Sequence, residues 1–158
     1  MSRTYWSSDL YPLFLKTVSS CTYVSFTDAE LENELSGLAR RAIARFKFPK
    51  ISLEYEFDPE LDAEGVVKGY YFVEEPRMLE MNVILAWMKV YWLEFQLSKE
   101  RNYENVYADK NVTAFSSGNL ISSMEKAYTT LRDEARKCEE DYGRISLDGK
   151  PAIGNINV

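Results

Sequence analysis

The stretch MLEMNVILAWMKVYWLEF, residues 78–95, decides the fold class. Its apolar side chains recur at the three- and four-residue spacing of one helix face, at Met78, Met81, Leu85, Met88, Trp92 and Phe95. Apolar residues also fill much of the opposite side, and a helix that is apolar nearly all round is buried on several faces. We therefore expect a central helix that follows Pro76 and ends near residues 99–102, with the other elements packed around it.

A second helix is predicted upstream of this one. Thr27 and Glu30 have the spacing of a capping box, in which each side chain bonds to the backbone N–H of the other residue. An apolar stripe then continues as far as Phe46, and Pro49 stops the helix. A shorter helix is expected near the N-terminus, where residues 7–9 are good N-caps and helical spacing relates Leu10, Phe14, Val18 and Cys21.

The last predicted helix has a heptad pattern. From Ile121 to Tyr142 the apolar side chains alternate at three and four residues, the spacing of a helix that packs along another helix. We expect this seam to pack on the 78–95 helix. The polar segment 103–115 between the two helices is expected to be a loop.

Between the helices, the apolar period becomes that of a strand. Residues 51–57 alternate apolar and polar side chains, and a second strand-like run covers residues 66–73. The acidic segment 58–65 joins them, so residues 50–73 are predicted to form an antiparallel hairpin. The carboxylates of that segment do not have the spacing of a calcium loop, and we interpret it as a solvated turn.

The predicted fold is mainly α: a helical bundle of three to four helices with a β-hairpin insertion at about 50–73, all within one domain over residues 1–143. Residues 144–158 have no helical period, and they contain Gly149, Pro151 and Gly154. We expect them to form an extended C-terminal arm that is mobile in the isolated protein.

The composition excludes several classes of enzyme. The 158 residues include no histidine, which removes Ser-His-Asp and Cys-His catalysis and HExxH zinc sites. Cys21 and Cys138 form no CxxC motif, and no glycine-rich phosphate loop follows a strand. We expect no enzymatic activity, no cofactor and no metal. The eleven tyrosines suit surfaces that become protein interfaces.

The net charge of −6 disfavours non-specific binding to nucleic acid. One basic cluster remains, which could make weak contact with a DNA backbone and consists of Arg40, Arg41, Arg45, Lys47 and Lys50. The helix dipole explains most of these charges, because they lie at a predicted helix C-terminus. No apolar run is long enough for a membrane span, and no secretion signal is recognisable, so synthesis in a reducing cytoplasm is expected.

The order of these elements resembles the head-to-tail connector proteins, also called adaptor or neck proteins, of tailed bacteriophages. The resemblance covers about residues 27–145. It rests on a capped helix ending in Ala44-Arg45-Phe46, the apolar helix from Met78, the segment Phe115-Ser116-Ser117-Gly118-Asn119-Leu120, and a charged helix closing at Tyr142-Gly143-Arg144.

The resemblance implies a non-enzymatic virion protein, made in the host cytoplasm, that assembles as a ring of commonly twelve copies under the portal protein. Such a ring extends the DNA channel and docks the next neck or tail component, with at most weak contact to packaged DNA. The arm is expected to bind the portal or a neighbouring copy through Arg144, Ile145, Leu147, Ile153, Ile156 and Val158.

The alternative is a small soluble binding or inhibitor protein that engages a host partner. Its hairpin would add a strand to a sheet of that partner. The residues expected to form this hairpin interface are Leu53, Tyr55, Phe57, Tyr70 and Tyr71.

Overall fold

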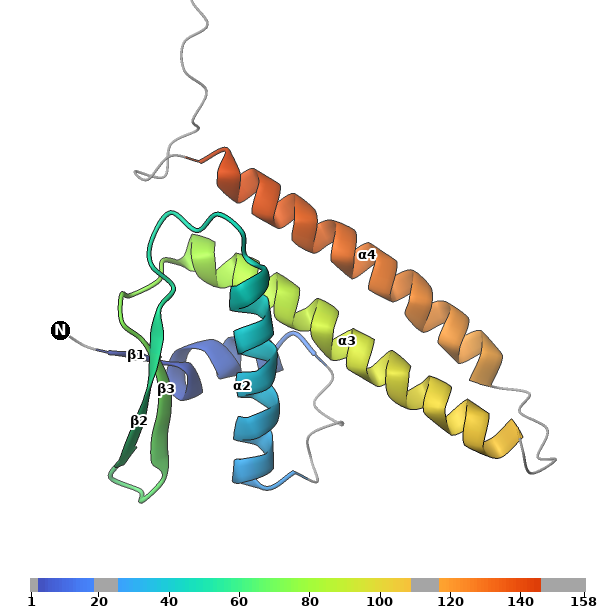
Figure 1. Ribbon diagram of the computed structural model, residues 1–158, viewed down its shortest axis with the longest axis horizontal. Coiled ribbons are helices and arrows are strands. Elements are labelled where there is room, and N and C mark those ends of the chain that lie inside the picture. The colour runs from blue at the N-terminus through green and yellow to red at the C-terminus, as the bar shows by residue number, and fades with distance from the viewer. Residues whose placement is uncertain (1–2, 19–25, 109–116, 146–158) are drawn as a thin grey trace, which may run out of the picture.

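The computed structural model describes residues 3–18, 26–108 and 117–145 (Figure 1). In chain order the elements are β1 (Thr4–Tyr5), the π-helical turn η1 (Trp6–Leu10), α1 (Tyr11–Leu15), α2 (Asp28–Arg45), β2 (Tyr55–Leu61), β3 (Val67–Phe72), α3 (Met78–Ala108) and α4 (Ser117–Gly143). The fold is mainly α with a small antiparallel sheet, which confirms the predicted class.

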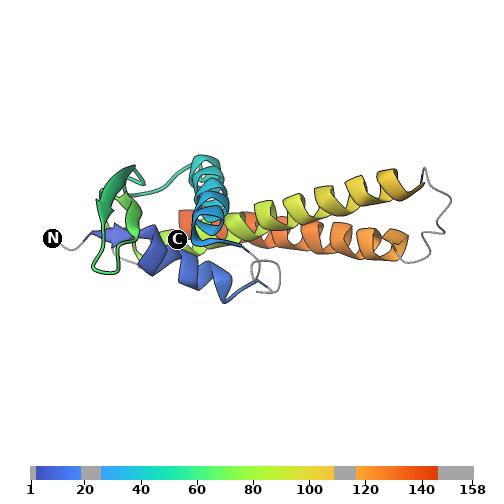
Figure 2. The ribbon, with the colours of Figure 1, turned by 90° about the horizontal axis from the view of Figure 1, so that it is seen from below.

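The two longest helices, α3 and α4, run antiparallel along each other and form a rod that projects beyond the other elements (Figures 1 and 2). The predicted seam lies at their contact, where side chains of α4 are buried or packed against the core: Ile121, Tyr128, Leu131, Ala135, Cys138 and Tyr142. Residues 103–108, predicted to be loop, are helical. No glycine or proline interrupts residues 99–108, so each added residue extends the helix by one hydrogen bond.

Helix α2 begins with the predicted capping box. The Thr27 hydroxyl accepts a hydrogen bond from the Glu30 N–H at 3.3 Å, and the Glu30 carboxylate accepts one from the Thr27 N–H at 2.8 Å. These bonds also hold the pKa of Glu30 below its ordinary value. The buried side of α2 includes Leu35, Leu38 and Ala42, and it crosses α3 near the start of the rod (Figure 1).

The N-terminal prediction was wrong in part. The expected helix running from about Leu10 towards Cys21 is limited to η1 and α1, and Cys21 lies outside the described residues. Ahead of them, Thr4 and Tyr5 pair with β3 as a strand that the sequence analysis missed. This pairing places the next residue, Trp6, in the core, where it is fully buried.

The sheet has the strand order β1-β3-β2, and both pairings are antiparallel. Tyr55 and Phe57 of β2 lie opposite Phe72 and Tyr70 of β3. The hairpin exists, but β2 is shifted towards the C-terminus of its predicted range and includes residues 58–61, which were expected to form a solvated loop.

The actual hairpin turn is built by Asp62. Its Oδ1 accepts hydrogen bonds from the N–H groups of Glu64 at 3.0 Å and Val66 at 2.8 Å. Gly65 follows at a φ of +80°, which favours glycine. These local bonds place the turn at residues 62–66, and the strand therefore continues past the position where the loop was predicted.

Candidate interaction surfaces

The inner face of the sheet is part of the core. Trp6 lies against the rings of Tyr55 at 4.9 Å, Tyr70 at 5.0 Å and Phe72 at 5.5 Å between ring centroids. The predicted hairpin interface therefore consists mostly of packed residues: Tyr55 and Tyr70 are half-buried and Leu53 is buried. Of this face, Phe57 remains open to solvent, with 51% of its surface exposed.

The outer face of the sheet has a polar network that sequence reasoning missed. The Asp58 carboxylate accepts hydrogen bonds from the Tyr5 hydroxyl at 2.7 Å and from Arg3 at 3.0 Å. Alongside it, the Tyr71 hydroxyl donates to Glu56. The bonds from Tyr5 and from a backbone N–H lower the pKa of Asp58, so this buried carboxylate stays ionised. The network attaches β1 to the hairpin.

Exposed aliphatic side chains gather at the hairpin turn. Leu61 and Val67 are paired across the two strands, and Val66 precedes Val67. All three are about half exposed or more. We refer to Leu61, Val66 and Val67 as the tip patch. The bonds to Asp62 fix the backbone of the turn that carries this patch.

The predicted basic cluster makes mostly internal contacts. Arg41 pairs with Glu94 at 2.8 Å and its guanidinium lies 4.1 Å from the centroid of the Tyr91 ring. Arg45 lies 4.3 Å from the Trp87 ring, and Arg40 lies 5.6 Å from the Tyr70 ring.

The lysines of the cluster lie beyond the end of α2. The Lys50 ammonium donates to the carbonyl oxygens of Tyr142 at 3.1 Å and Gly143 at 3.3 Å, so it caps the C-terminus of α4. Lys47 is exposed, and its backbone N–H donates to Glu139 at 2.9 Å. The structure therefore brings the five cations together as a link between α2, the hairpin and the rod, and contact with DNA stays a prediction.

A buried carboxylate joins three segments at the start of α3. Glu80 is 0% exposed, and it accepts hydrogen bonds from the Tyr142 hydroxyl at 2.7 Å and the Arg77 N–H at 3.0 Å. The Arg77 guanidinium also pairs with it. Burial alone would raise the pKa of Glu80, but the bonds from Arg77 and Tyr142 outweigh it and lower the pKa. The Tyr142 hydroxyl in turn accepts from the Lys50 N–H at 2.7 Å.

Exposed apolar residues also occur at this end of the molecule. Phe48 is 81% exposed, and Val73 and Met78 are more than half exposed. Phe48 and Met78 are two residues from Lys50 and Glu80, respectively, which bond to the end of α4, and Val73 donates its N–H to the Glu54 carbonyl at 2.9 Å. We refer to Phe48, Val73 and Met78 as the base patch. Sequence reasoning did not identify it, although an aromatic residue between Lys47 and Pro49, after the predicted helix, is a usable signal.

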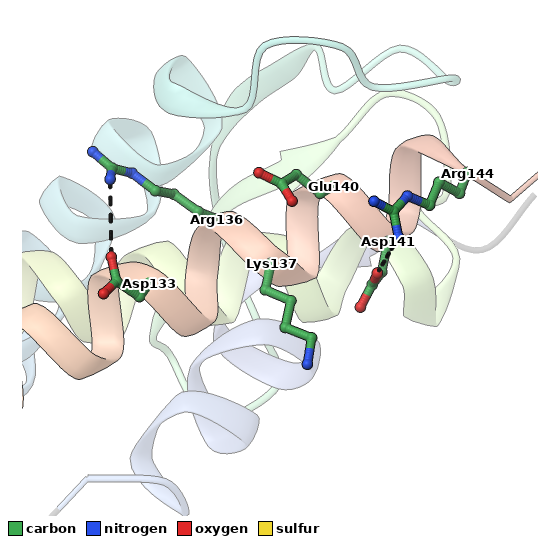
Figure 3. A pocket seen from close by; sticks show the side chains of 6 residues that line it. All are labelled: Asp133, Arg136, Lys137, Glu140, Asp141 and Arg144. Atoms are coloured by element: carbon green, nitrogen blue, oxygen red, sulfur yellow. Dashed lines mark ion pairs between the residues drawn. The ribbon is translucent and has the colours of Figure 1, made fainter.

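The outer face of α4 is charged. Figure 3 shows a shallow hollow lined by Asp133, Arg136, Lys137, Glu140, Asp141 and Arg144. Within it Arg136 pairs with Asp133 at 3.9 Å and Arg144 pairs with Asp141 at 3.7 Å. Arg144 was predicted as an arm residue, and these exposed pairs are those of a solvated helix face.

Ile145 is the last described residue and is half-buried. Its N–H donates to the Tyr142 carbonyl at 3.1 Å, and its side chain lines a groove between α3 and α4. The other predicted arm residues, Leu147, Ile153, Ile156 and Val158, lie outside the described residues.

Within the described ranges, no three histidine, cysteine, aspartate or glutamate side chains are grouped so that they could hold a metal ion. In the same part of the chain, no helix has the length and apolar character needed to cross a membrane.

Comparison with known proteins gives no match: no family model and no curated protein matches the sequence, and no solved structure matches the fold. The resemblance to phage connectors therefore stays a prediction from the order of elements.

Proposed function

We propose that this chain is a structural head-to-tail adaptor of a tailed-phage virion, which forms a ring under the portal protein. The ring would extend the DNA channel and dock the next neck or tail component. The observation that best supports this proposal is the exposure of two different apolar patches, the tip patch and the base patch, on one chain. A contact between unlike patches of neighbouring copies is heterologous, and such contacts form a ring when the rotation between copies closes.

The two patches lie at opposite ends of the hairpin. The tip patch surrounds the turn at residues 62–66, whereas Val73 of the base patch bonds to Glu54 at the open end of the two strands. Figure 1 shows the turn at the lower left and the start of α3 at the upper left. This separation supports the ring, because one copy can contact a neighbour at each end simultaneously.

The rod supports the channel-extending part of the proposal. A helix of 31 residues, such as α3, is about 46 Å long at about 1.5 Å per residue. Its exposed surface includes charged pairs such as Arg101 and Glu125 at 2.5 Å. A rod of this kind gives each subunit a polar spacer between the surface that binds its neighbours and the far end of the molecule.

Sedimentation velocity with and without purified portal rings tests the proposal. The free protein should sediment as a monomer or a small oligomer, and it should move with the portal rings when they are added. Phe48→Asp and Leu61→Asp should each weaken ring formation on the portal. The matched control is Leu120→Asp, because Leu120 is an exposed aliphatic residue outside both patches. A full-length protein that never sediments with the cognate portal contradicts the adaptor function.

A binding protein that extends a partner's sheet is the second candidate. Its supporting observation is that β2 is an edge strand of the sheet and exposes Phe57. If the chain extends a partner's sheet, Phe57→Asp should abolish binding to that partner. The same variant should not affect assembly on portal rings, so the two measurements separate the two functions.

A further inference from the structure

A groove runs between α3 and α4 on the side of the rod that includes Cys138. It consists of two adjoining hollows of about 340 Å³ and 320 Å³, and both are lined by Asn82, Glu134 and Cys138. Apolar side chains cover its floor: Leu79 and Ile145 at one end, and Leu85, Ala86 and Leu131 at the other. Charged residues of both signs, among them Lys137 and Asp141, line its edge.

We propose that this groove is the docking site of the chain's own C-terminal segment, residues 147–158, in the isolated protein, in place of the mobile arm expected from the sequence. The first argument is continuity. Ile145 already lines the end of the groove, held there by the bond from its N–H to the Tyr142 carbonyl. The segment that follows therefore starts at the site it would occupy.

The length and the side chains of the C-terminal segment fit this groove. The thirteen residues 146–158 reach about 43 Å when extended, at about 3.3 Å per residue. The stretch of α4 from Tyr142 back to Leu131 is about 17 Å long at about 1.5 Å per residue, so the reach is ample. The segment has aliphatic side chains set among small and polar ones, at Leu147, Ile153, Ile156 and Val158.

The same chain is favoured over a second copy as the source of the segment. A short tether gives the segment an effective concentration in the millimolar range, far above that of the free protein in solution. Docking within one chain is therefore favoured over docking between two chains. An arm held in this way leaves the free protein monomeric, and an adaptor would release it when the portal or a neighbour offers a better site.

Cys138 gives a direct readout, because it lines both hollows of the groove. Cys21→Ser leaves Cys138 as the single thiol, and its rate of alkylation by a maleimide is then measured under native conditions. The chain that ends at Ile145 should react ~10-fold faster than the full chain, since a segment docked about ten times more often than not protects the thiol by that factor. Protection in the full chain should be the same at low and high protein concentration.

Two full-length variants keep the test decisive if the shortened chain folds poorly. Ile156→Asp should raise the alkylation rate towards that of the shortened chain, because it places a carboxylate in the apolar groove. Asn157→Asp is the matched control: it adds the same charge one residue later at a polar position and should leave the rate unchanged.

Equal alkylation rates for the full chain and Ile156→Asp would overturn the proposal. Protection that increases with protein concentration would also overturn it, and would assign the groove to the arm of a second copy. The measurement needs no portal protein, so its result does not depend on the adaptor function.

Discussion

The base of the molecule and the far part of the rod are stabilised differently. In the base, the sheet, α2 and the neighbouring ends of α3 and α4 contribute to one core, and Trp6 is fully buried in it among aromatic rings. In the far part of the rod, α3 and α4 lie along each other without a third element of the described residues beside them (Figure 2). Leu97 and Ile121 are buried in these two helices. The local stability of a long helix therefore varies along its length, because it depends on how many elements pack around each segment.

The largest effect is expected at the boundary of the two regions. Leu131 is half-buried and packs against the core from α4, so Leu131→Asp places a carboxylate against the apolar side of α3. An unpaired carboxylate that is partly desolvated there costs several kcal/mol, a large part of the total stability of a domain, so the variant should be unfolded or close to unfolding. Circular dichroism and thermal melting measure this. Thr130→Asp, at the exposed neighbouring position, is the control and should fold normally. A cooperative melt of Leu131→Asp would show that the two regions do not depend on this contact.

The next effect tests the base alone. Trp6→Ala should lower the free energy of unfolding by about 3–5 kcal/mol, because it leaves a large cavity between the sheet and the helices. Urea denaturation followed by circular dichroism measures the loss. Phe48→Ala removes an aromatic ring that is exposed, and it should cost less than about 0.5 kcal/mol. Equal losses in the two variants would refute the aromatic core.

A smaller effect is expected at the link between the start of α3 and the end of α4. Tyr142→Phe removes the hydroxyl that donates to Glu80 and accepts from Lys50, which should cost about 1–3 kcal/mol because the buried Glu80 carboxylate and the part-buried Lys50 N–H each lose a bond. Denaturant titration measures the loss. A Tyr142→Phe protein as stable as the wild type would show that this hydroxyl does not link the helices.

The same link predicts a dependence on pH. The folded protein lowers the pKa of Glu80, so the contribution of Glu80 to stability is complete above the ordinary glutamate pKa of about 4.3 and is lost as the pH falls through the lowered value. Between those values, Glu80→Gln should lose less stability with falling pH than the wild type. Parallel curves for the two proteins over this range would contradict the assignment.

The smallest effect is expected in the far part of the rod. Arg101 and Glu125 are paired across α3 and α4 but are both about half exposed, so Glu125→Ala should change the free energy of unfolding by less than about 0.5 kcal/mol. Amide hydrogen exchange should nonetheless be faster around Leu97 and Ile121 than around Trp87 in the wild type. Uniform protection along α3 would remove the contrast between the two regions.

Much of the helical architecture was predictable from the sequence because its signals are local. The capping box at Thr27 acts over three residues, and the seam of α4 is visible as spacing within single turns. Strand limits were less accurate. The end of β2 depends on the bonds that Asp62 makes in the turn, and an acidic residue in the sequence does not reveal which backbone groups it will contact.

The candidate surfaces were predicted less well than the fold, for the same physical reason. Tyr55 and Tyr70 have the alternation of an exposed strand face, but they pack on Trp6, which is 49 and 64 residues earlier in the chain. The basic cluster has the composition of a nucleic-acid site, but Arg41 and Arg45 lie over the rings of α3. The residue type limits which groups a side chain can bind. The fold determines which of those groups lies next to it.

The class of the fold, the three long helices, the existence of the hairpin and the exclusion of histidine-based catalysis follow from composition and spacing, which act within a few residues. Three features depend on how the elements pack: β1 joins the sheet, Asp58 and Glu80 are buried with partners, and a groove lies between α3 and α4 beside Ile145. Those features join residues that are more than fifty positions apart, as Tyr5 with Asp58 and Glu80 with Tyr142. Contacts of that range form when whole elements pack, so the partner of each residue is set by the arrangement of the elements and not by its neighbours in the chain.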